Sequence, residues 1–204
     1  MKASHLSIMP LLAATALTLV SQPAHANGEI DLDLGLQGTT TAWPDDHGAG
    51  GVLDASFWFL PWLGASYIGK ESYSMVDQRS MTYFSLNAAF RADLGGPRLT
   101  GTIGAVHQHE EPGSAVSAMP VESLFGVGDG IRHRMAGRAG AQLAYPVWDY
   151  GRGDLFVAVD LDVTKFLDKD KGPSWQSSLG VSFGATYDFS RAKHRRVREE
   201  VVTK

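Results

Sequence analysis

The segment His107–Glu111, with the sequence HQHEE, is the part of this chain best suited to chemistry. In an extended backbone, side chains two residues apart point the same way, so His107 and His109 share one face. Two imidazoles on one face can bind a transition-metal ion, and the two glutamates could add oxygen ligands. Asp45–His47 is a second cluster of these residue types. Because no spacing fixes a third and a fourth ligand, we predict an exposed polar segment rather than a metal site.

Other motifs that carry chemistry are missing from the sequence. No serine lies in a pattern that marks a nucleophile for Ser-His-acid catalysis. The glycine-rich run Gly126–Gly130 lacks the Lys-Ser/Thr of a phosphate-binding loop and precedes a strand-like segment. The formal net charge is −4, and the strand-like segments carry no basic patch that would bind nucleic acid. We therefore expect no catalytic residues, no cofactor and no nucleic-acid partner.

Alternation of apolar and polar residues is the dominant pattern of the chain. It is clearest in residues 175–189, where one set of alternate side chains is mainly apolar or aromatic and the other is small or polar. This pattern is typical of a β-strand with one apolar face. At roughly 15 residues the strand exceeds the usual soluble length of about 5–6 residues. Its length, its apolar face and the aromatics at its ends fit a strand that crosses a membrane.

Eight segments show this alternation, with turn-forming residues between them. They cover residues 29–43, 52–60, 63–69, 81–94, 99–106, 131–145, 154–166 and 175–189. The connections 60–62, 95–98 and 146–153 are mostly short, whereas the others are polar and mostly longer, up to 107–130. Short turns at one end and longer loops at the other are typical of outer-membrane barrels. We predict an all-β fold, an eight-stranded antiparallel up-and-down transmembrane β-barrel.

The N-terminus has the layout of a secretory signal peptide. A lysine lies near the start, a short apolar run follows, and Ala24-His25-Ala26 provides small residues at a cleavage site. We expect cleavage after Ala26, which leaves residues 27–189 as the barrel domain and residues 190–204 as a basic, disordered periplasmic tail. The chain has no cysteine, so neither disulfides nor thiolate metal sites are possible.

The second face of the strands helps to distinguish a barrel in lipid from a barrel in water. A soluble barrel turns a charged face to the solvent, which favours lysine and glutamate. Here the second face is rich in small residues and nearly free of lysine, which suits the narrow interior of an eight-stranded barrel. A soluble periplasmic barrel that binds an apolar ligand is kept as an alternative.

Charged side chains recur on this second face, which points inward in a membrane barrel. For a hairpin centred near residues 148–149, we predict Arg138 opposite Asp162. Opposite charges across strands stabilise each other, and an unpaired buried charge is costly, so we interpret the network as structural. A charged pore would need a wider barrel. The predicted interior network consists of Asp54, Arg91, Arg132, Arg134, Arg138, Asp160 and Asp162.

Aromatic residues gather near the strand ends. Tryptophan and tyrosine are enriched where a membrane meets water, because their rings are apolar and their polar atoms favour hydration. Trp58 lies on the inward register instead, where we expect it to fill the interior. The predicted interface aromatics are Trp43, Trp62, Trp148, Trp175, Tyr187 and Phe189.

The signal peptide, the eight strands and the last strand, which ends in FGATYDF (residues 183–189), together resemble the small eight-stranded outer-membrane β-barrel proteins of Gram-negative bacteria. The resemblance covers nearly all of the mature chain. It implies a monomer in contact with outer-membrane lipid and lipopolysaccharide, and a strand 175–189 that resembles the signal read by the outer-membrane insertion machinery. This chain departs from the pattern by continuing past Phe189.

The resemblance is specific for architecture rather than activity, because such barrels include structural proteins, adhesins and lipid-modifying enzymes. We expect a non-catalytic, structural or adhesin-like role in the cell outer membrane. A lipid A-modifying enzyme is an alternative within the same architecture. Its Ser-His-acid site would face the lipid near the rim, and His133 lies on that register.

Overall fold

The computed structural model describes residues 28–168 and 170–189 of the chain. Two short helices, α2 (Gly113–Ala118) and α3 (Pro120–Leu124), lie between the fifth and sixth strands. The predicted signal peptide and basic tail fall outside the described residues. The strands are β1 (Glu29–Thr41), β2 (His47–Leu60), β3 (Leu63–Ser74), β4 (Arg79–Asp93), β5 (Arg98–Pro112), β6 (Arg132–Asp149), β7 (Asp154–Phe166) and β8 (Trp175–Asp188).

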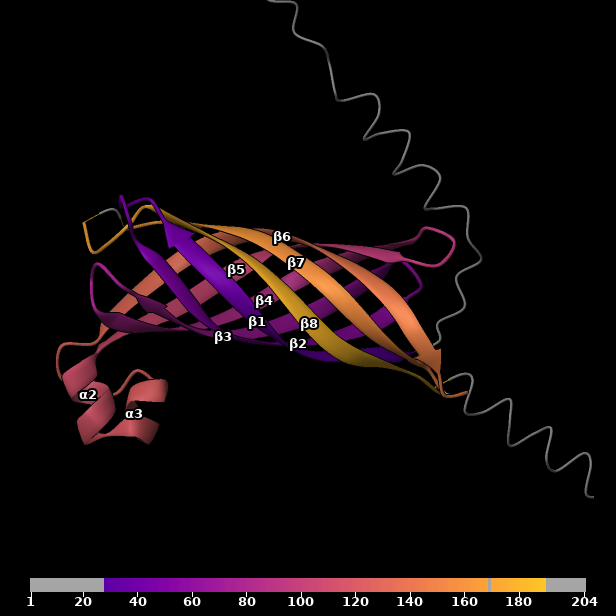
Figure 1. Ribbon diagram of the computed structural model, residues 1–204, viewed down its shortest axis with the longest axis horizontal. Helices are drawn as coiled ribbons and strands as arrows, with labels where there is room; N and C mark the ends of the chain where they lie inside the picture. The colour runs from indigo at the N-terminus through magenta and orange to yellow at the C-terminus, as the bar shows by residue number, and fades with distance from the viewer. Residues whose placement is uncertain (1–27, 169, 190–204) are drawn as a thin grey trace, which may run out of the picture.

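The eight strands form one closed sheet. Each strand pairs with the next in antiparallel orientation, and β1 pairs with β8, so no edge is left open (Figure 1). At this seam Leu34 lies opposite Phe183. Closure gives the backbone groups of the first and last strands their hydrogen-bond partners. The predicted all-β, eight-stranded antiparallel up-and-down barrel is confirmed.

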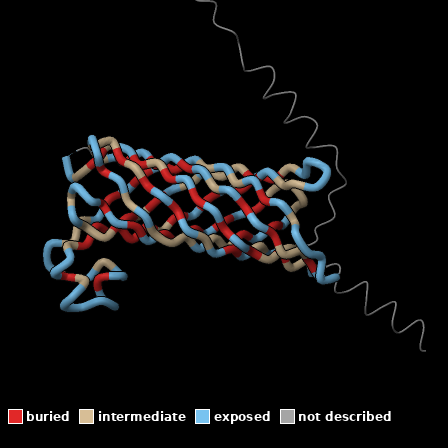
Figure 2. Tube along the Cα trace, viewed as in Figure 1, coloured by how far each residue is buried: buried red, intermediate tan, exposed pale blue. Residues whose placement is uncertain are grey.

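Buried and more exposed residues alternate along most of the barrel wall, as Figure 2 shows, and the loop-end parts of β4 and β5 are buried on both faces. In β1, Leu34 and Leu36 are exposed over 64% and 72% of their surface, whereas Asp33 and Gln37 are buried. The outside of the barrel is therefore largely apolar, and its inside is largely polar. A soluble protein has the opposite arrangement, because water favours polar side chains on the surface.

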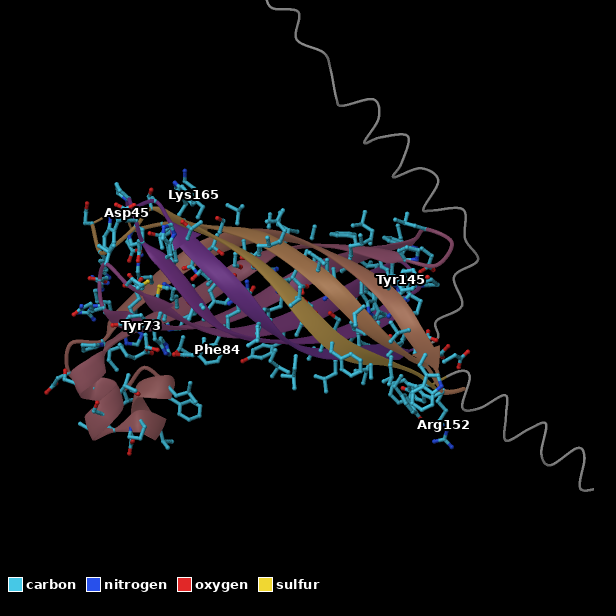
Figure 3. The ribbon with its side chains drawn as sticks, in the orientation of Figure 1. Asp45, Tyr73, Phe84, Tyr145, Arg152 and Lys165 are labelled. Carbon is cyan, nitrogen blue, oxygen red and sulfur yellow. The ribbon has the colours of Figure 1, made fainter. Side chains whose placement is uncertain are left out.

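The two ends of the barrel carry different connections. At one end lie the turns 61–62, 94–97 and 150–153 and both ends of the described chain; we call it the turn end. At the other, the loop end, lie the connections 42–46, 75–78, 113–131 and 167–174. Figure 1 shows α2 and α3 beside the barrel at the loop end. In Figure 3, Asp45, Tyr73 and Lys165 lie at the loop end, and Tyr145 and Arg152 lie at the turn end.

Several strands extend farther toward the loop end than predicted. β2, β3 and β5 each include residues from segments predicted as loops, which are 44–51, 70–80 and 107–130. Lys70 and His107 are thus strand residues. The apolar pattern of the outer face stops before these positions, but the backbone hydrogen-bond ladder continues because a neighbouring strand supplies partners on each side. The predicted boundaries of these three loops are therefore wrong, whereas the predicted connection 167–174 matches the structure. The connections 42–46 and 75–78 have five and four residues, close to the length of the turns.

No helix in the described part of the chain is long and apolar enough to cross a membrane.

Close packing inside the barrel predicts the effect of a single methyl group. A Cβ on Gly184 would lie 2.4 Å from Phe156 Cζ and 2.5 Å from Asp33 Cβ. We predict that Gly184→Ala lowers the free energy of unfolding by about 1–3 kcal/mol, because overpacking displaces these neighbours. Urea unfolding in detergent micelles, followed by tryptophan fluorescence, measures the change. Gly101→Ala is the control, since its Cβ would meet nothing within 4 Å; equal losses in both variants would contradict the packing argument.

Candidate functional site

An ion-pair cluster fills the inside of the barrel near the turn end. The guanidinium of Arg91 pairs with Glu29 and lies 3.6 Å from Asp31. Arg98 approaches the same Asp31 carboxylate at 3.8 Å. The Arg91 guanidinium also lies 4.4 Å from the centre of the Trp58 ring, and Trp58 Nε1 donates a hydrogen bond to Asp31. Trp58 is therefore an interior residue that holds this cluster in place.

A second charged group links strands across the barrel interior. Lys70 Nζ pairs with Asp162 and donates a hydrogen bond of 2.9 Å to Ser178 Oγ. Arg138 Nε lies 3.8 Å from Asp162 Oδ1. Sequence reasoning missed Lys70, because it lies just past the predicted end of its strand. The continuing alternation of Lys70, Ser72 and Ser74 on one face is the signal that identifies it.

Arg138 and Asp162 share the inward face but are not directly opposite each other. Arg138 pairs across the strands with Thr164, and Asp162 pairs with Gly140. The predicted register is therefore wrong. β6 runs farther than predicted, so the turn lies at 150–153 and every pairing in the hairpin shifts. The two charges meet diagonally, which long side chains allow.

Acidic residues of β1, β2 and β7 form a third group that surrounds Gln142. Its Nε2 donates hydrogen bonds to Asp33 Oδ2 at 3.2 Å and to Asp160 Oδ1 at 2.9 Å. Ser56 Oγ donates to Asp54 Oδ1 at 3.1 Å. The cavity beside these groups measures about 20 Å³, which holds about one water molecule. At this level side chains fill the interior.

Arg134 closes the interior toward the loop end. Its side chain is completely buried, and its guanidinium lies 3.1 Å from Glu110 Oε1 and 3.2 Å from Asp168 Oδ1. The same guanidinium lies over the Phe166 ring at 3.9 Å. Arg132 adds a second contact to Glu110 at 2.5 Å. The structure thus places on the inward face Asp54, Arg91, Arg132, Arg134, Arg138, Asp160 and Asp162.

The six predicted interface aromatics lie at the two ends of the barrel. Trp148 and Phe189, at the turn end, are exposed over 64% and 47% of their surface, and Trp175, at the loop end, over 41%. The rings of Tyr187 and Phe189 meet edge to face with centres 4.9 Å apart. The structure therefore puts Trp62, Trp148, Tyr187 and Phe189 at the turn end, and Trp43 and Trp175 at the loop end.

Three histidines converge on the outward face of β5 and β6 near the loop end. The register places His109 opposite His133, and His107 lies on the same face two residues away. The centre of the His109 ring lies 4.7 Å from that of His107 and 4.8 Å from that of His133, and the centres of the His107 and His133 rings are 5.5 Å apart. One ring nitrogen from each residue lies within 4.8 Å of the others. We call His107, His109 and His133 the outer histidine cluster.

The connection 113–131 covers part of the outer histidine cluster. Gly126 follows α3 with a φ of 75°, and its backbone lies so close that a Cβ would be 2.6 Å from His109 Cε1. The ring of Phe84, which Figure 3 shows on the barrel wall near α2 and α3, meets His109 edge-on at 5.8 Å. His109 is therefore buried on the outside of the barrel, whereas His107 is half-buried and His133 is exposed.

A carboxylate and two hydroxyl groups lie beside the histidines on the same outward face. Thr82 Oγ1 donates a hydrogen bond of 2.7 Å to Glu71, and Ser80 Oγ donates to the other oxygen of the same carboxylate. Thr82 lies directly opposite His109 across the strands. A catalytic hydroxyl would instead donate to a histidine that acts as its base. The arrangement of these two hydroxyls is therefore that of a structural contact.

The structure brings together the two histidines that the sequence singled out and adds a third. His107 and His109 are two residues apart, so any strand aligns them. The position of His133 depends on the pairing of β5 with β6. That pairing cannot be calculated from the sequence, because the connection 113–131 contains two helices of a geometry that local propensity does not specify.

Comparisons with known proteins find a likeness in structure and none in sequence. No protein-family model matches the chain, and no curated protein matches it by sequence. Neisserial surface protein A (NspA) has a TM-score of 0.54 and 10% identity, covering 82% of this chain and 100% of that one. The N-terminal β-barrel domain of Pseudomonas aeruginosa OprF has a TM-score of 0.47 and 18% identity, and the match covers 79% of this chain and 99% of that domain. Ail, the attachment invasion locus protein of Yersinia pestis, has a TM-score of 0.46 and 19% identity, covering 80% and 99%.

At these identities the likeness to Neisserial surface protein A concerns the fold and not the activity. The shared barrel covers most of this chain and the whole of Neisserial surface protein A. With eight antiparallel strands closed by the seam between β1 and β8, this chain has the fold of the small outer-membrane β-barrels.

Proposed function

We propose that this protein is an outer-membrane β-barrel with a structural or adhesin-like role at the cell surface. The observation that carries the proposal is the distribution of side chains between the two faces of the sheet. The exposed wall is apolar, and the buried interior holds the charges. In water such a wall would be a very large apolar patch, which soluble monomers avoid. In a bilayer the same wall contacts acyl chains at no such cost.

The apolar wall and the aromatic ends together support a membrane location. Trp148 and Trp175, at opposite ends of the barrel, are positioned to anchor the two interfaces. A soluble barrel that carries an apolar ligand is less well supported, because its cavity would need apolar walls. Apolar residues at least half exposed on the strands are Leu32, Leu34, Leu36, Leu86, Ile103, Val147, Trp148, Val159, Leu161, Val163, Leu179, Val181 and Phe183.

The filled interior supports a role without transport. Arg134 and its partners close the loop end, and the clusters around Asp162 and Asp31 occupy the space below. Removing one partner of such a buried pair would leave an uncompensated charge, so each charge in the interior requires its partner. We therefore propose a monomeric barrel whose interior serves stability and whose outside serves interaction.

The connection 113–131 is the part best suited to contact the surroundings. It projects beside the barrel at the loop end (Figure 1), and it exposes apolar side chains beyond those of the wall. Such side chains can contact lipopolysaccharide or a surface partner. In the same proposal, β8 serves as the strand recognised by the outer-membrane insertion machinery. The exposed apolar residues of the connection are Met119, Val121, Leu124, Phe125 and Val127.

A lipid A-modifying activity is less well supported. Ser80 and Thr82, the hydroxyls next to the histidines, donate to Glu71. Mass spectrometry of lipid A from cells with and without the protein tests this alternative directly. We expect identical lipid A species, and a difference that depends on the protein would replace the proposal with an enzymatic one.

Fractionation of cells tests the proposed location. We expect the protein in the outer-membrane fraction, and we expect it to migrate differently in a gel before and after boiling, because a folded barrel resists detergent. A cytoplasmic and a periplasmic marker protein serve as controls. Recovery of the protein in the soluble periplasmic fraction would reject the proposal.

A charge on the apolar wall tests whether that wall contacts lipid. Val159 lies on the outward face of β7 and is half exposed. We predict that Val159→Arg lowers the free energy of unfolding in lipid vesicles by about 2–4 kcal/mol, the cost of an arginine near the bilayer centre. Urea unfolding in vesicles measures this change. Lys165→Arg, on the same face of β7 near the loop end, is the control and should have little effect; an equally mild effect of Val159→Arg would contradict the proposal.

Conductance measurements test whether the interior is closed. Because ion pairs and Arg134 fill the barrel, we predict that the purified protein produces no discrete current steps in a planar lipid bilayer. A large porin inserted under the same conditions is the positive control. Regular current steps from this protein, in proportion to the amount inserted, would show an open pore and refute the closed interior.

A further inference from the structure

We propose that the outer histidine cluster, formed by His107, His109 and His133, is a binding site for a divalent first-row transition-metal ion such as Zn²⁺ or Cu²⁺. The proposal concerns the outside of the barrel wall near the loop end. It depends on the pairing of β5 with β6 and holds whether the protein has a structural or an adhesive role.

The distances between the imidazoles are close to those of a metal centre. In a tetrahedral zinc site with bonds of about 2.0–2.1 Å, ligand nitrogens lie roughly 3.3 Å apart. His133 Nδ1 and His107 Nε2 are already 3.4 Å apart. One ring nitrogen from each of the three histidines, His109 included, lies within 4.8 Å of the other two. Small rotations of the side chains would therefore bring all three nitrogens to one ion without a change of the backbone.

A shared ligand accounts for the convergence of all three rings, although His133 Nδ1 and His107 Nε2 can also share a hydrogen bond. Three imidazoles lie within van der Waals reach of one another, and in residues 28–168 and 170–189 no ion pair links any of them to a carboxylate. Protonated imidazoles at this spacing would repel one another. A metal ion binds the neutral form of each ring and replaces this repulsion by attraction.

The surroundings hold the buried ligand and leave a path to the others. Gly126 and the Phe84 ring confine the ring of His109 on two sides. His107 Nδ1 contacts Met135 Sδ at 3.1 Å, so its Nε2 is the nitrogen turned toward His133. His133 is exposed, and an ion can therefore enter from outside. Rigid strands carry all three ligands, which favours a fixed geometry.

The donor set indicates the class of metal. Three imidazole nitrogens suit zinc, copper and nickel, whereas magnesium and calcium require oxygen ligands. The nearby Glu71 carboxylate already accepts hydrogen bonds from Ser80 and Thr82. Three protein ligands leave a fourth tetrahedral position, which water or an external group would occupy.

Calorimetric titration of the purified protein with ZnCl₂ tests the proposal. The protein is extracted from membranes into detergent micelles and carries no polyhistidine tag. We expect one Zn²⁺ per chain and no binding heat with MgCl₂ or CaCl₂. Loss of a direct ligand in His107→Asn or His133→Asn should weaken Zn²⁺ binding at least as much as the roughly 10–100-fold seen when outer-shell partners are lost.

Matched variants separate this site from other histidines and from misfolding. His47→Asn alters an exposed histidine of β2 outside the cluster and should bind Zn²⁺ like the unaltered protein. Gly126→Ala keeps all three ligands but crowds the His109 ring, and it should weaken binding while Gly101→Ala does not. The shift in gel mobility on boiling confirms that each variant is folded. No saturable Zn²⁺ binding, or unchanged affinity in folded His107→Asn and His133→Asn, would overturn the proposal.

Discussion

Closure of the sheet between β1 and β8 is the constraint on which the rest of the structure depends. A closed sheet of eight strands has an interior only wide enough for side chains. Inward residues must therefore contact residues from distant strands, as Lys70 of β3 does with Asp162 of β7. Since little water can enter, charges in this space require partners. The outward residues have no protein neighbours beyond the wall. Because most of them are apolar, they are most stable in an apolar environment.

The backbone hydrogen bonds of the closed sheet also explain why polar residues at the loop end occupy defined positions. The strands continue past the apolar part of the wall, so residues such as Glu71, Thr82 and His109 keep strand geometry instead of forming mobile loops. Backbone pairing then determines which of them meet. The outer histidine cluster results from one pairing, His109 with His133, combined with the two-residue repeat that aligns His107. The residues of this surface belong to the backbone hydrogen-bond ladder although they lie at the edge of the barrel.

Much of the fold could be predicted because strand alternation is a local signal. The number of strands and the assignment of faces follow from the period of two, and the antiparallel order follows from the short connections. β7 and β8 begin at the predicted residues. The loop-end boundaries were less predictable, because polar outward residues interrupt the hydrophobic pattern without interrupting the strand. Lys70 was assigned to a loop for this reason. The pairing of Arg138 also differed, since a hairpin register depends on where the turn lies and β6 extends past Tyr145.

The sequence by itself determined which side chains share a face, because that depends only on the alternating direction of residues along a strand. It therefore specified the apolar wall, the polar interior and the common direction of His107 and His109. Only the tertiary structure decided which strands' residues meet, since register follows from turn position, loop geometry and closure. Thus Arg138 contacts Asp162 diagonally, and Lys70 reaches the same carboxylate from across the barrel. His133 completes a cluster with two histidines that lie more than twenty residues earlier in the chain.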